Sequence, residues 1–224
     1  MNGNHASEEE KNTAVTGIVL AGGASRRMGT NKALLPVGDK RSIEHAVAGL
    51  KPICSRVIIS SNDEDAYAFL GLDIVPDRYP QLGPMSGIHA GLSASESRWN
   101  VVAACDMPFL DAAVIAALVQ IAEAAERREP GLEAVIPVAA GREQPLLAVY
   151  RRDVRHGLER RLQKRELRLT DWILGLRKEI VDEARLAELT GHQPERLLFN
   201  MNRPEDYSEA CRWIGPSDRQ LGDG

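Results

Sequence analysis

The sequence is poor in several features that would each point to a particular class of protein. Aromatic residues make up only 4% of the 224 residues, but with 43% hydrophobic residues the chain can bury a core of Ala, Val, Ile and Leu, so whole-chain disorder is excluded. No run approaches the roughly 18 apolar residues of a membrane span, so we expect a soluble protein without membrane contact. The three cysteines, Cys54, Cys105 and Cys211, are odd in number and far apart. They therefore predict neither a disulfide framework nor paired zinc ligands, and a reducing, cytoplasmic location fits best.

An excess of positive charge is also missing. Lys and Arg total 28 against 32 for Asp and Glu, and the net charge of -4 argues against a nucleic-acid-binding protein. The polar start, residues 1–14, lacks the basic and apolar regions of a secretory signal, and residues 215–224 are rich in Gly, Asp and Ser, so both ends are expected to be disordered tails. Residues 15–214 then form a single domain, which we expect to be monomeric.

Segments with the periods of strands and helices alternate in the first half of the chain. Ser42 is expected to cap a helix with an apolar stripe at helical spacing, and Asp111 is expected to cap a second helix. The predicted buried strands are residues 16–20, 57–59, 73–75 and 101–105. This alternation predicts an α/β protein, a three-layer Rossmann-like sandwich whose ligand crevice lies at the carboxyl ends of parallel strands.

The second half departs from this alternation. The extended runs 134–138 and 145–150 are separated by a turn, which predicts an antiparallel excursion in a mixed, mostly parallel sheet. A helix is expected over residues 153–164, followed by a short one capped by Thr170 or Asp171. The last apolar run, residues 197–199, is expected to end as a strand ahead of a helix that begins at Pro204.

The turn after the first strand combines glycines and cations in the segment LAGGASRRMGTNK, residues 20–32. Gly22 and Gly23 allow backbone N–H groups to face an anion, and Arg27 and Lys32 add positive charge, so the segment is typical of a phosphate cradle. It matches neither a Walker loop nor the G-x-G-x-x-G fingerprint of dinucleotide-binding proteins. The alternative is a surface turn with solvated cations.

Further polar motifs follow other predicted strands. Residues 76–92, PDRYPQLGPMSGIHAGL, contain glycines suited to a loop that approaches a planar ligand, although a flexible connection explains them too. Asp106 follows a buried strand, where a carboxylate can hold Mg²⁺ together with substrate phosphates, or can cap a turn. Asn200 and Asn202, in FNMNRPEDY, taken alone are turn and cap residues.

Four ordered blocks between residues 20 and 207 resemble one family. The first is similar to the signature L-A-(G/A)-G-x-(S/A)-x-R-M-G-x-x-K of nucleotidyltransferases with a Rossmann-like fold, and its LAGG form resembles the molybdenum cofactor guanylyltransferases, the MobA family. The resemblance implies catalysis by Lys32, Arg27 and Asp106, with Mg²⁺ held by Asp106. It implies nucleotide binding by Leu20, Ala21, Gly22, Gly23, Lys32, Asn62, Asp77, Gly83, Gly87 and Asp106, and molybdopterin binding by Gln144, Arg168, Asn200 and Asn202.

One feature fits the resemblance less closely, and one basic segment bears on the molybdopterin site that it implies. Ser60 and Ser61 stand at a strand end where several relatives have asparagine, so Asn62 or a backbone group would have to reach the nucleotide. Residues 151–168 contain eight basic and three acidic residues, a pattern typical of a solvated helix face, from which Arg168 could reach the molybdopterin phosphate.

The reaction that the resemblance implies is transfer of GMP from GTP to the terminal phosphate of molybdenum-molybdopterin, with release of pyrophosphate. Implied protein partners are a molybdenum-insertion protein and apo-molybdoenzymes or their chaperones. Two alternatives remain open: a cytidylyltransferase or sugar- or alditol-phosphate nucleotidyltransferase of the same fold, or a non-catalytic nucleotide-binding protein that delivers cofactor.

Overall fold

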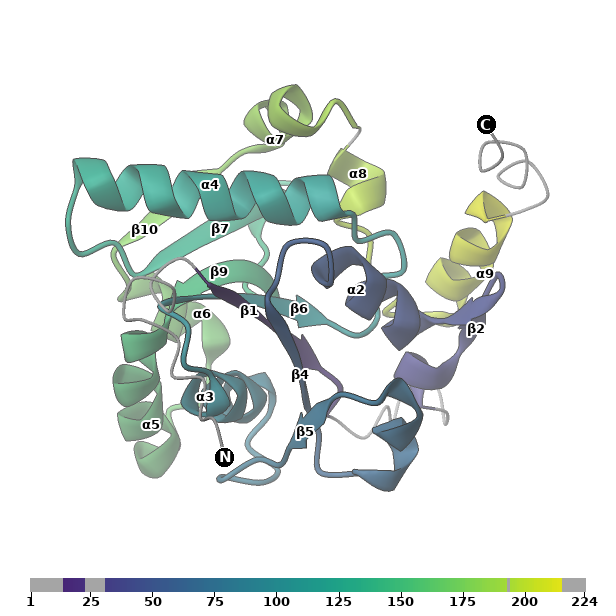
Figure 1. Ribbon diagram of the computed structural model, residues 1–224, viewed down its shortest axis with the longest axis horizontal. Coiled ribbons are helices and arrows are strands. Elements are labelled where there is room, and N and C mark those ends of the chain that lie inside the picture. Colours follow the sequence, from purple (N-terminus) through teal and green to yellow (C-terminus); the bar gives the residue numbers. More distant parts are fainter. Residues whose placement is uncertain (1–13, 23–30, 193, 215–224) are drawn as a thin grey trace, which may run out of the picture.

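The computed structural model describes residues 14–22, 31–192 and 194–214, and a mixed central sheet organises them (Figure 1). Across this sheet the strand order is β10-β7-β9-β6-β1-β4-β5. The β1 strand pairs in parallel with β4 and β6, and β4 pairs in parallel with β5, so their carboxyl ends share one edge. The bounds are β1 (Val15–Leu20), β4 (Arg56–Ser60), β5 (Asp73–Val75) and β6 (Trp99–Ala104).

The sheet also contains antiparallel pairs. Strand β9 (Leu147–Arg151) is antiparallel to both β6 and β7 (Ala134–Ala139), while β10 (Lys178–Val181) is parallel to β7. The short β8 (Arg142–Glu143) pairs with the end of β7. Because β9 is reversed, it begins where β6 ends, with Leu147 opposite Ala103. The predicted antiparallel excursion is therefore confirmed, and it brings the start of β9 to the edge where the parallel strands end.

Helices cover both faces of the sheet, as Figure 1 shows. On one face lie α2 (Ser42–Leu50), α4 (Ala112–Arg128) and α7 (Glu183–Thr190); on the other lie α3 (Pro84–Ala94), α5 (Arg155–Lys164) and α6 (Leu169–Leu174). Successive strand side chains point to opposite faces, so Val19 packs into the first core and Ile18 and Leu20 into the second. This confirms the predicted three-layer α/β architecture.

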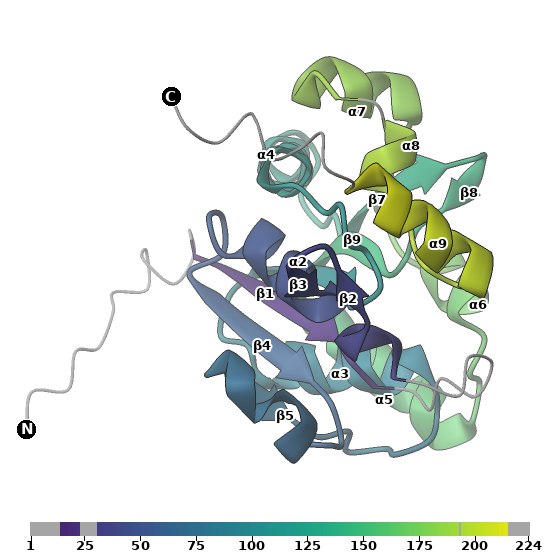
Figure 2. The same cartoon turned by 90° about the vertical axis from the view of Figure 1, so that its right-hand side faces the viewer.

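The end of the chain returns to pack beside its beginning. Helix α9 (Pro204–Trp213) follows the short α8 (Pro194–Leu197) and lies against the hairpin formed by β2 (Pro36–Val37) and β3 (Lys40–Arg41), as Figure 2 shows. Val37, Met201 and Ala210 form a small buried cluster there. The Tyr207 hydroxyl donates to the Pro36 carbonyl at 2.8 Å. Residues far apart in sequence are thereby fixed next to the short helix η1 (Lys32–Leu34).

The predicted strands before residue 197 are confirmed, as are the Asp111 cap, whose carboxylate accepts from Ala113 N–H, and the start of a helix at Pro204. The connections 65–70 and 152–154 are the 3₁₀ helices η2 (Asp65–Leu70) and η3 (Arg152–Val154), the latter leading into the predicted helix α5. The hairpin β2–β3, strand β10 and helix α7 were not predicted. No helix in the described ranges has the length and apolar character needed to cross a membrane.

Three local predictions were wrong. Ser42 is the first helical residue rather than the cap, because its hydroxyl donates to the Cys105 carbonyl at 2.8 Å, a partner 63 residues away. Helix α6 begins one residue before Thr170, with Arg168 in the cap position, so neither Thr170 nor Asp171 caps it. Residues 197–199 are not a strand: Leu197 ends α8, and the residues after it have no regular structure.

Candidate active site

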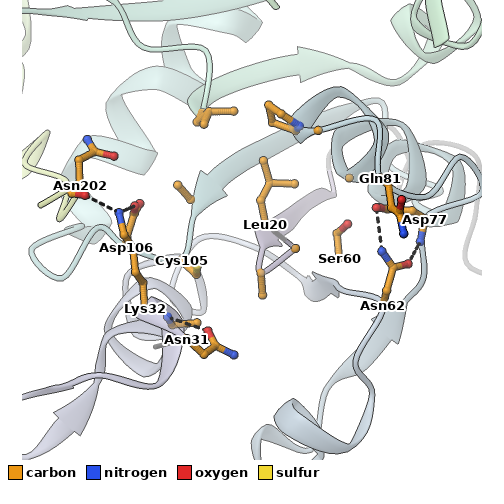
Figure 3. Close-up of a pocket in the computed structure, with 18 residues that line it drawn as sticks. Leu20, Asn31, Lys32, Ser60, Asn62, Asp77, Gln81, Cys105, Asp106 and Asn202 are labelled. Carbon is orange, nitrogen blue, oxygen red and sulfur yellow. Dashed lines mark hydrogen bonds and ion pairs between the residues drawn. The ribbon is translucent and has the colours of Figure 1, made fainter. Parts of the chain in front are cut away.

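A cavity of about 640 Å³ opens at the carboxyl ends of the parallel strands, where the topology predicted a ligand crevice. Figure 3 shows its polar side chains gathered at two ends, with Leu20 between them. Strand ends, the first turn of α3 and the segment before α9 all contribute to it. The lining residues are Leu20, Ala21, Gly22, Asn31, Lys32, Ala33, Ser60, Asn62, Asp77, Gln81, Gly83, Pro84, Gly87, Ala104, Cys105, Asp106, Leu146 and Asn202.

Lys32 occupies one end of the cavity and is held by the returning chain. Its ammonium group donates to the carbonyls of Met201, at 2.7 Å, and Asn202, at 2.9 Å. Asn202 is itself fixed, because its N–H donates to the Asp206 carboxylate at 2.8 Å. The Lys32 side chain is only 14% exposed, so its charge is oriented and partly shielded from solvent.

Asp106 lies next to Lys32, with 3.9 Å between the ammonium nitrogen and the carboxylate oxygen Oδ2 (Figure 3). It follows β6 directly, and its backbone carbonyl accepts from Met201 N–H at 2.9 Å, which ties it to the same returning segment. Burial raises the pKa of Asp106 above its ordinary value, while the charge of Lys32 acts in the opposite direction. Any further positive charge brought into the cavity would therefore stabilise the charged form of the Asp106 carboxylate.

A second polar pair stands at the opposite end of the cavity. Asn62 Nδ2 donates to the Asp77 carboxylate at 3.0 Å, and Asp77 N–H donates to Asn62 Oδ1 at 2.8 Å (Figure 3). These bonds join the segments that follow β4 and β5. Burial raises the pKa of Asp77, against the lowering effect of the hydrogen bond from Asn62. The pair presents a carboxylate acceptor in a defined orientation to a ligand.

The loop before α3 approaches the cavity closely. Gln81 and Gly83 have positive φ angles of 64° and 79°, and Pro84 begins the helix. A Cβ atom on Gly87 would lie 2.9 Å from the Ser60 hydroxyl, so only glycine fits without a shift. The Ser60 hydroxyl is buried and has no hydrogen-bond partner among the described residues. The backbone here lies against the cavity wall, as expected for a loop that approaches a planar ligand.

Most of the predicted site residues come together in this cavity. The structure brings together Leu20, Ala21, Gly22, Lys32, Asn62, Asp77, Gly83, Gly87, Asp106 and Asn202. Asn200 does not line it, but its side-chain oxygen accepts from Asn202 Nδ2 at 2.6 Å. Gly23 and Arg27 lie outside the described residues.

Besides Asn200, two further predicted molybdopterin residues do not line the cavity. The Gln144 amide instead donates to the Arg142 carbonyl at 3.0 Å, within the turn before β9, and Arg168 caps α6. For Gln144 the reason is the start of β9, where Leu146 rather than Gln144 lies at the wall and accepts from Ala104 N–H at 2.8 Å.

Sequence reasoning also missed Asn31, Ala33, Gln81, Pro84, Ala104, Cys105 and Leu146 as lining residues, and treated Ser60 as a departure. Asn31 and Cys105 could have been found from their position next to Lys32 and Asp106. Cys105 is a filler rather than a nucleophile, because burial raises the pKa of its thiol to about 12.

The arrangement suits binding of an extended anion. A fixed cation and a partly buried carboxylate stand at one end, a carboxylate–amide pair stands at the other, and the floor between them is apolar. Within the described ranges, no three or more His, Cys, Asp or Glu side chains are grouped so that they could hold a metal ion together. Asp106 therefore fits a divalent cation that takes one protein carboxylate and completes its shell with phosphate oxygens and water, which is the habit of Mg²⁺.

Comparisons with known proteins agree on one family. The family model described as a MobA-like NTP transferase domain matches residues 17–178. The chain is 34% identical to a probable molybdenum cofactor guanylyltransferase from Carboxydothermus hydrogenoformans, over 88% of this chain and 95% of that protein. A protein with the same description from Pelotomaculum thermopropionicum is 36% identical, over 87% of this chain and 91% of that one. The crystal structure of molybdopterin-guanine dinucleotide biosynthesis protein A from Archaeoglobus fulgidus superimposes with a TM-score of 0.75 at 27% identity, covering 88% of this chain and 97% of that one.

Proposed function

Because the chain belongs to the MobA-like NTP transferase family, we propose that it transfers GMP from GTP to the terminal phosphate of molybdenum-molybdopterin. The observation that carries this proposal is the pairing of Lys32 with Asp106 at the end of β6, in one cavity with the Asn62–Asp77 pair. The first pair suits reacting phosphates, and the second suits the nucleoside. The relatives named above support guanylyl transfer over cytidylyl or sugar-phosphate chemistry.

The chemistry is substitution at phosphorus. A terminal phosphate oxygen of molybdopterin forms a bond to the α-phosphorus of GTP, the bond from that phosphorus to the β-phosphate oxygen breaks, and pyrophosphate leaves with the bonding electrons. No protein nucleophile is required. The main barrier is the approach of two anions, so the chain contributes positioning and charge neutralisation.

Several residues that line the cavity have a role in that scheme. Lys32, oriented by two backbone carbonyls, faces the triphosphate and draws negative charge from the leaving group. Gly22 leaves room for the phosphates, and the Asn62–Asp77 pair accepts hydrogen bonds from the nucleoside. Gly83 and Gly87 let the loop close on the guanine ring.

We propose Asp106 as the protein ligand of Mg²⁺. When bound, the ion would supply positive charge that offsets the negative charge of the substrate phosphates. The raised pKa of Asp106 fits this role, because a buried carboxylate with one cation 3.9 Å away is stabilised in its charged form by a second.

The acceptor is proposed to enter beside the returning segment. Asn202 lines the cavity and Asn200 holds its amide, so both are suited to the molybdopterin side of the reaction. Gly23 and Arg27 remain proposed phosphate contacts, and Gln144 and Arg168 would contribute only to a bound molybdopterin that extends beyond the cavity. A monomeric, cytoplasmic, single-domain protein that exchanges cofactor with a molybdenum-insertion protein and apo-molybdoenzymes or their chaperones stays a prediction.

The test is incubation of the protein with molybdenum-molybdopterin, Mg²⁺ and each of GTP, ATP, CTP and UTP in turn. Pyrophosphate release is measured, and the dinucleotide formed is identified by mass spectrometry. We expect molybdopterin guanine dinucleotide with GTP only. A cytosine dinucleotide, or turnover only with a sugar or alditol phosphate, would replace this proposal with another transferase; GTP binding without turnover would indicate a cofactor-delivery protein.

A further inference from the structure

Tyr67 is a buried residue for which the proposed chemistry has no role. It lies in η2, on the connection between β4 and β5, and is only 1% exposed. Its side chain packs in the core with α2 and α4 and does not line the cavity. Its hydroxyl, however, reaches two residues that do.

The hydroxyl joins the two ends of the glycine-rich turn. It accepts a hydrogen bond from Asn31 Nδ2 at 2.9 Å and lies 3.2 Å from the Ala21 carbonyl, to which it donates. Ala21 follows β1, and Asn31 precedes η1; the residues numbered 23–30 between them lie outside the described ranges. One oxygen atom thus spans positions that are ten residues apart in sequence.

Ala21 and Asn31, the two residues that the Tyr67 hydroxyl contacts, each make a further hydrogen bond to a neighbouring element. Ala21 N–H donates to the Ser60 carbonyl at 2.9 Å, which fixes it to the end of β4. Asn31 Oδ1 accepts from Ala33 N–H at 3.1 Å, which caps η1. The Tyr67 hydroxyl therefore links the end of β1 to the start of η1 through a single oxygen atom.

The distance between Ala21 and Asn31 matters because the next residue after each of them lines the cavity. Gly22 follows Ala21 and Lys32 follows Asn31, and both line the cavity (Figure 3 shows Asn31 and Lys32 on one wall). A ligand that contacts both must match their separation. Electrostatic contacts to phosphate lose effect steeply when such groups move by even about 1 Å.

We propose that Tyr67 is a positioning residue for the triphosphate: its hydroxyl sets the separation of Gly22 and Lys32 from behind the cavity wall, without touching the ligand. The inference rests on the proposed function only for the identity of the nucleotide, since any nucleoside triphosphate or pyrophosphate held between these residues would depend on Tyr67 in the same way.

The experiment compares Tyr67→Phe with Thr16→Val. The first removes only the bridging oxygen. The control removes a buried hydroxyl near the start of β1, at the end of that strand opposite to Ala21. There Thr16 Oγ1 and Ser97 Oγ lie 2.7 Å apart. Affinities for magnesium pyrophosphate and magnesium GTP are measured by calorimetry, KM and kcat with both substrates by turnover, and Tm by thermal unfolding.

We expect Tyr67→Phe to weaken pyrophosphate and GTP binding and to lower kcat/KM for GTP by about 10- to 100-fold, with an unchanged KM for molybdopterin. Thr16→Val should lower Tm by about as much as Tyr67→Phe does and should keep the wild-type KM and kcat. Unchanged affinities in Tyr67→Phe, or equal losses in both variants, would overturn the inference and leave guanylyl transfer untouched. Weakened binding in Tyr67→Phe alone, in a protein that forms no guanine dinucleotide, would uphold the positioning role and refute the proposed reaction.

Discussion

Replacing Asp106 with asparagine separates the chemical role of this residue from its structural one. Asparagine has nearly the same shape, and the backbone bond from Met201 N–H to the residue 106 carbonyl is unaffected, so the returning segment should keep its position. The negative charge beside Lys32 and the proposed metal ligand are lost. Loss of one electrostatic partner in a transition state typically lowers kcat by about 10²- to 10³-fold, or about 3–4 kcal/mol. We expect a loss of that size in guanylyl transfer.

The same substitution should not lower stability. At 3.9 Å and an effective dielectric constant of about 20, the attraction between Lys32 and Asp106 is at most about 4 kcal/mol. Burial nevertheless raises the pKa of Asp106 despite Lys32, so desolvation of the carboxylate outweighs this attraction in the free protein. Asparagine removes the desolvation cost, and Lys32 retains the carbonyls of Met201 and Asn202 as acceptors.

The sign of the pH dependence follows from linkage. A folded-state pKa above the unfolded value means that the folded protein binds the proton more tightly, so wild-type stability falls as pH rises from the unfolded pKa of about 3.9 through the raised pKa of Asp106. The variant lacks this titration. The Tm of the variant minus that of wild type should therefore increase as the pH rises from about 4 through the raised pKa of Asp106.

The assays are dinucleotide formation at saturating substrates and thermal unfolding across that pH range. Near wild-type guanylyl transfer by Asp106→Asn would refute the assigned role of the carboxylate. A large loss of Tm at neutral pH would show that the desolvation argument is wrong and that the pair is structural.

Three further substitutions test other parts of the site. Lys32→Met should lower kcat/KM for GTP by about 10²-fold, measured by pyrophosphate release, and wild-type rates would exclude Lys32 as the phosphate cation. Gly87→Ala should reduce stability by about 1–3 kcal/mol and weaken GTP binding, because its Cβ would meet the Ser60 hydroxyl at 2.9 Å; the double variant with Ser60→Gly should recover both, and no recovery would contradict the steric explanation. Tyr79→Phe removes a 2.8 Å bond to Glu159 that ties the loop before α3 to α5, so KM for GTP should rise by a few-fold with little change in kcat; an unchanged KM would show that the loop does not need this anchor.

The sequence predicted the parts of the fold and site that depend on local pattern. Buried strands followed by glycine or carboxylate predicted both the sheet edge and the positions of Gly22 and Asp106 on it. The reversal of β9 was predicted because two extended runs flank a short turn. Parallel strands share an edge, so residues at several strand ends could be assigned to one cavity before any coordinates.

What could not be predicted depends on contacts between distant segments. The hydroxyl of Ser42 was assigned to a cap, but the Cys105 carbonyl competes for it, and no local pattern shows that. The binding of Lys32 by carbonyls 169 and 170 residues later is equally invisible in sequence. Gln144 was assigned to the molybdopterin site on the resemblance alone, whereas Leu146, whose carbonyl accepts from Ala104 N–H at 2.8 Å, lines the wall.

The attachment of Lys32 to the carbonyls of residues 201 and 202 has a consequence for biogenesis. During translation the sheet strands emerge before this segment, so a ribosome-bound intermediate can complete its central layer while the ammonium group still lacks its acceptors. The nascent chain would then stay catalytically silent until synthesis has passed Asn202. A charged substrate would thus meet a competent enzyme only after residues 201 and 202 have left the exit tunnel.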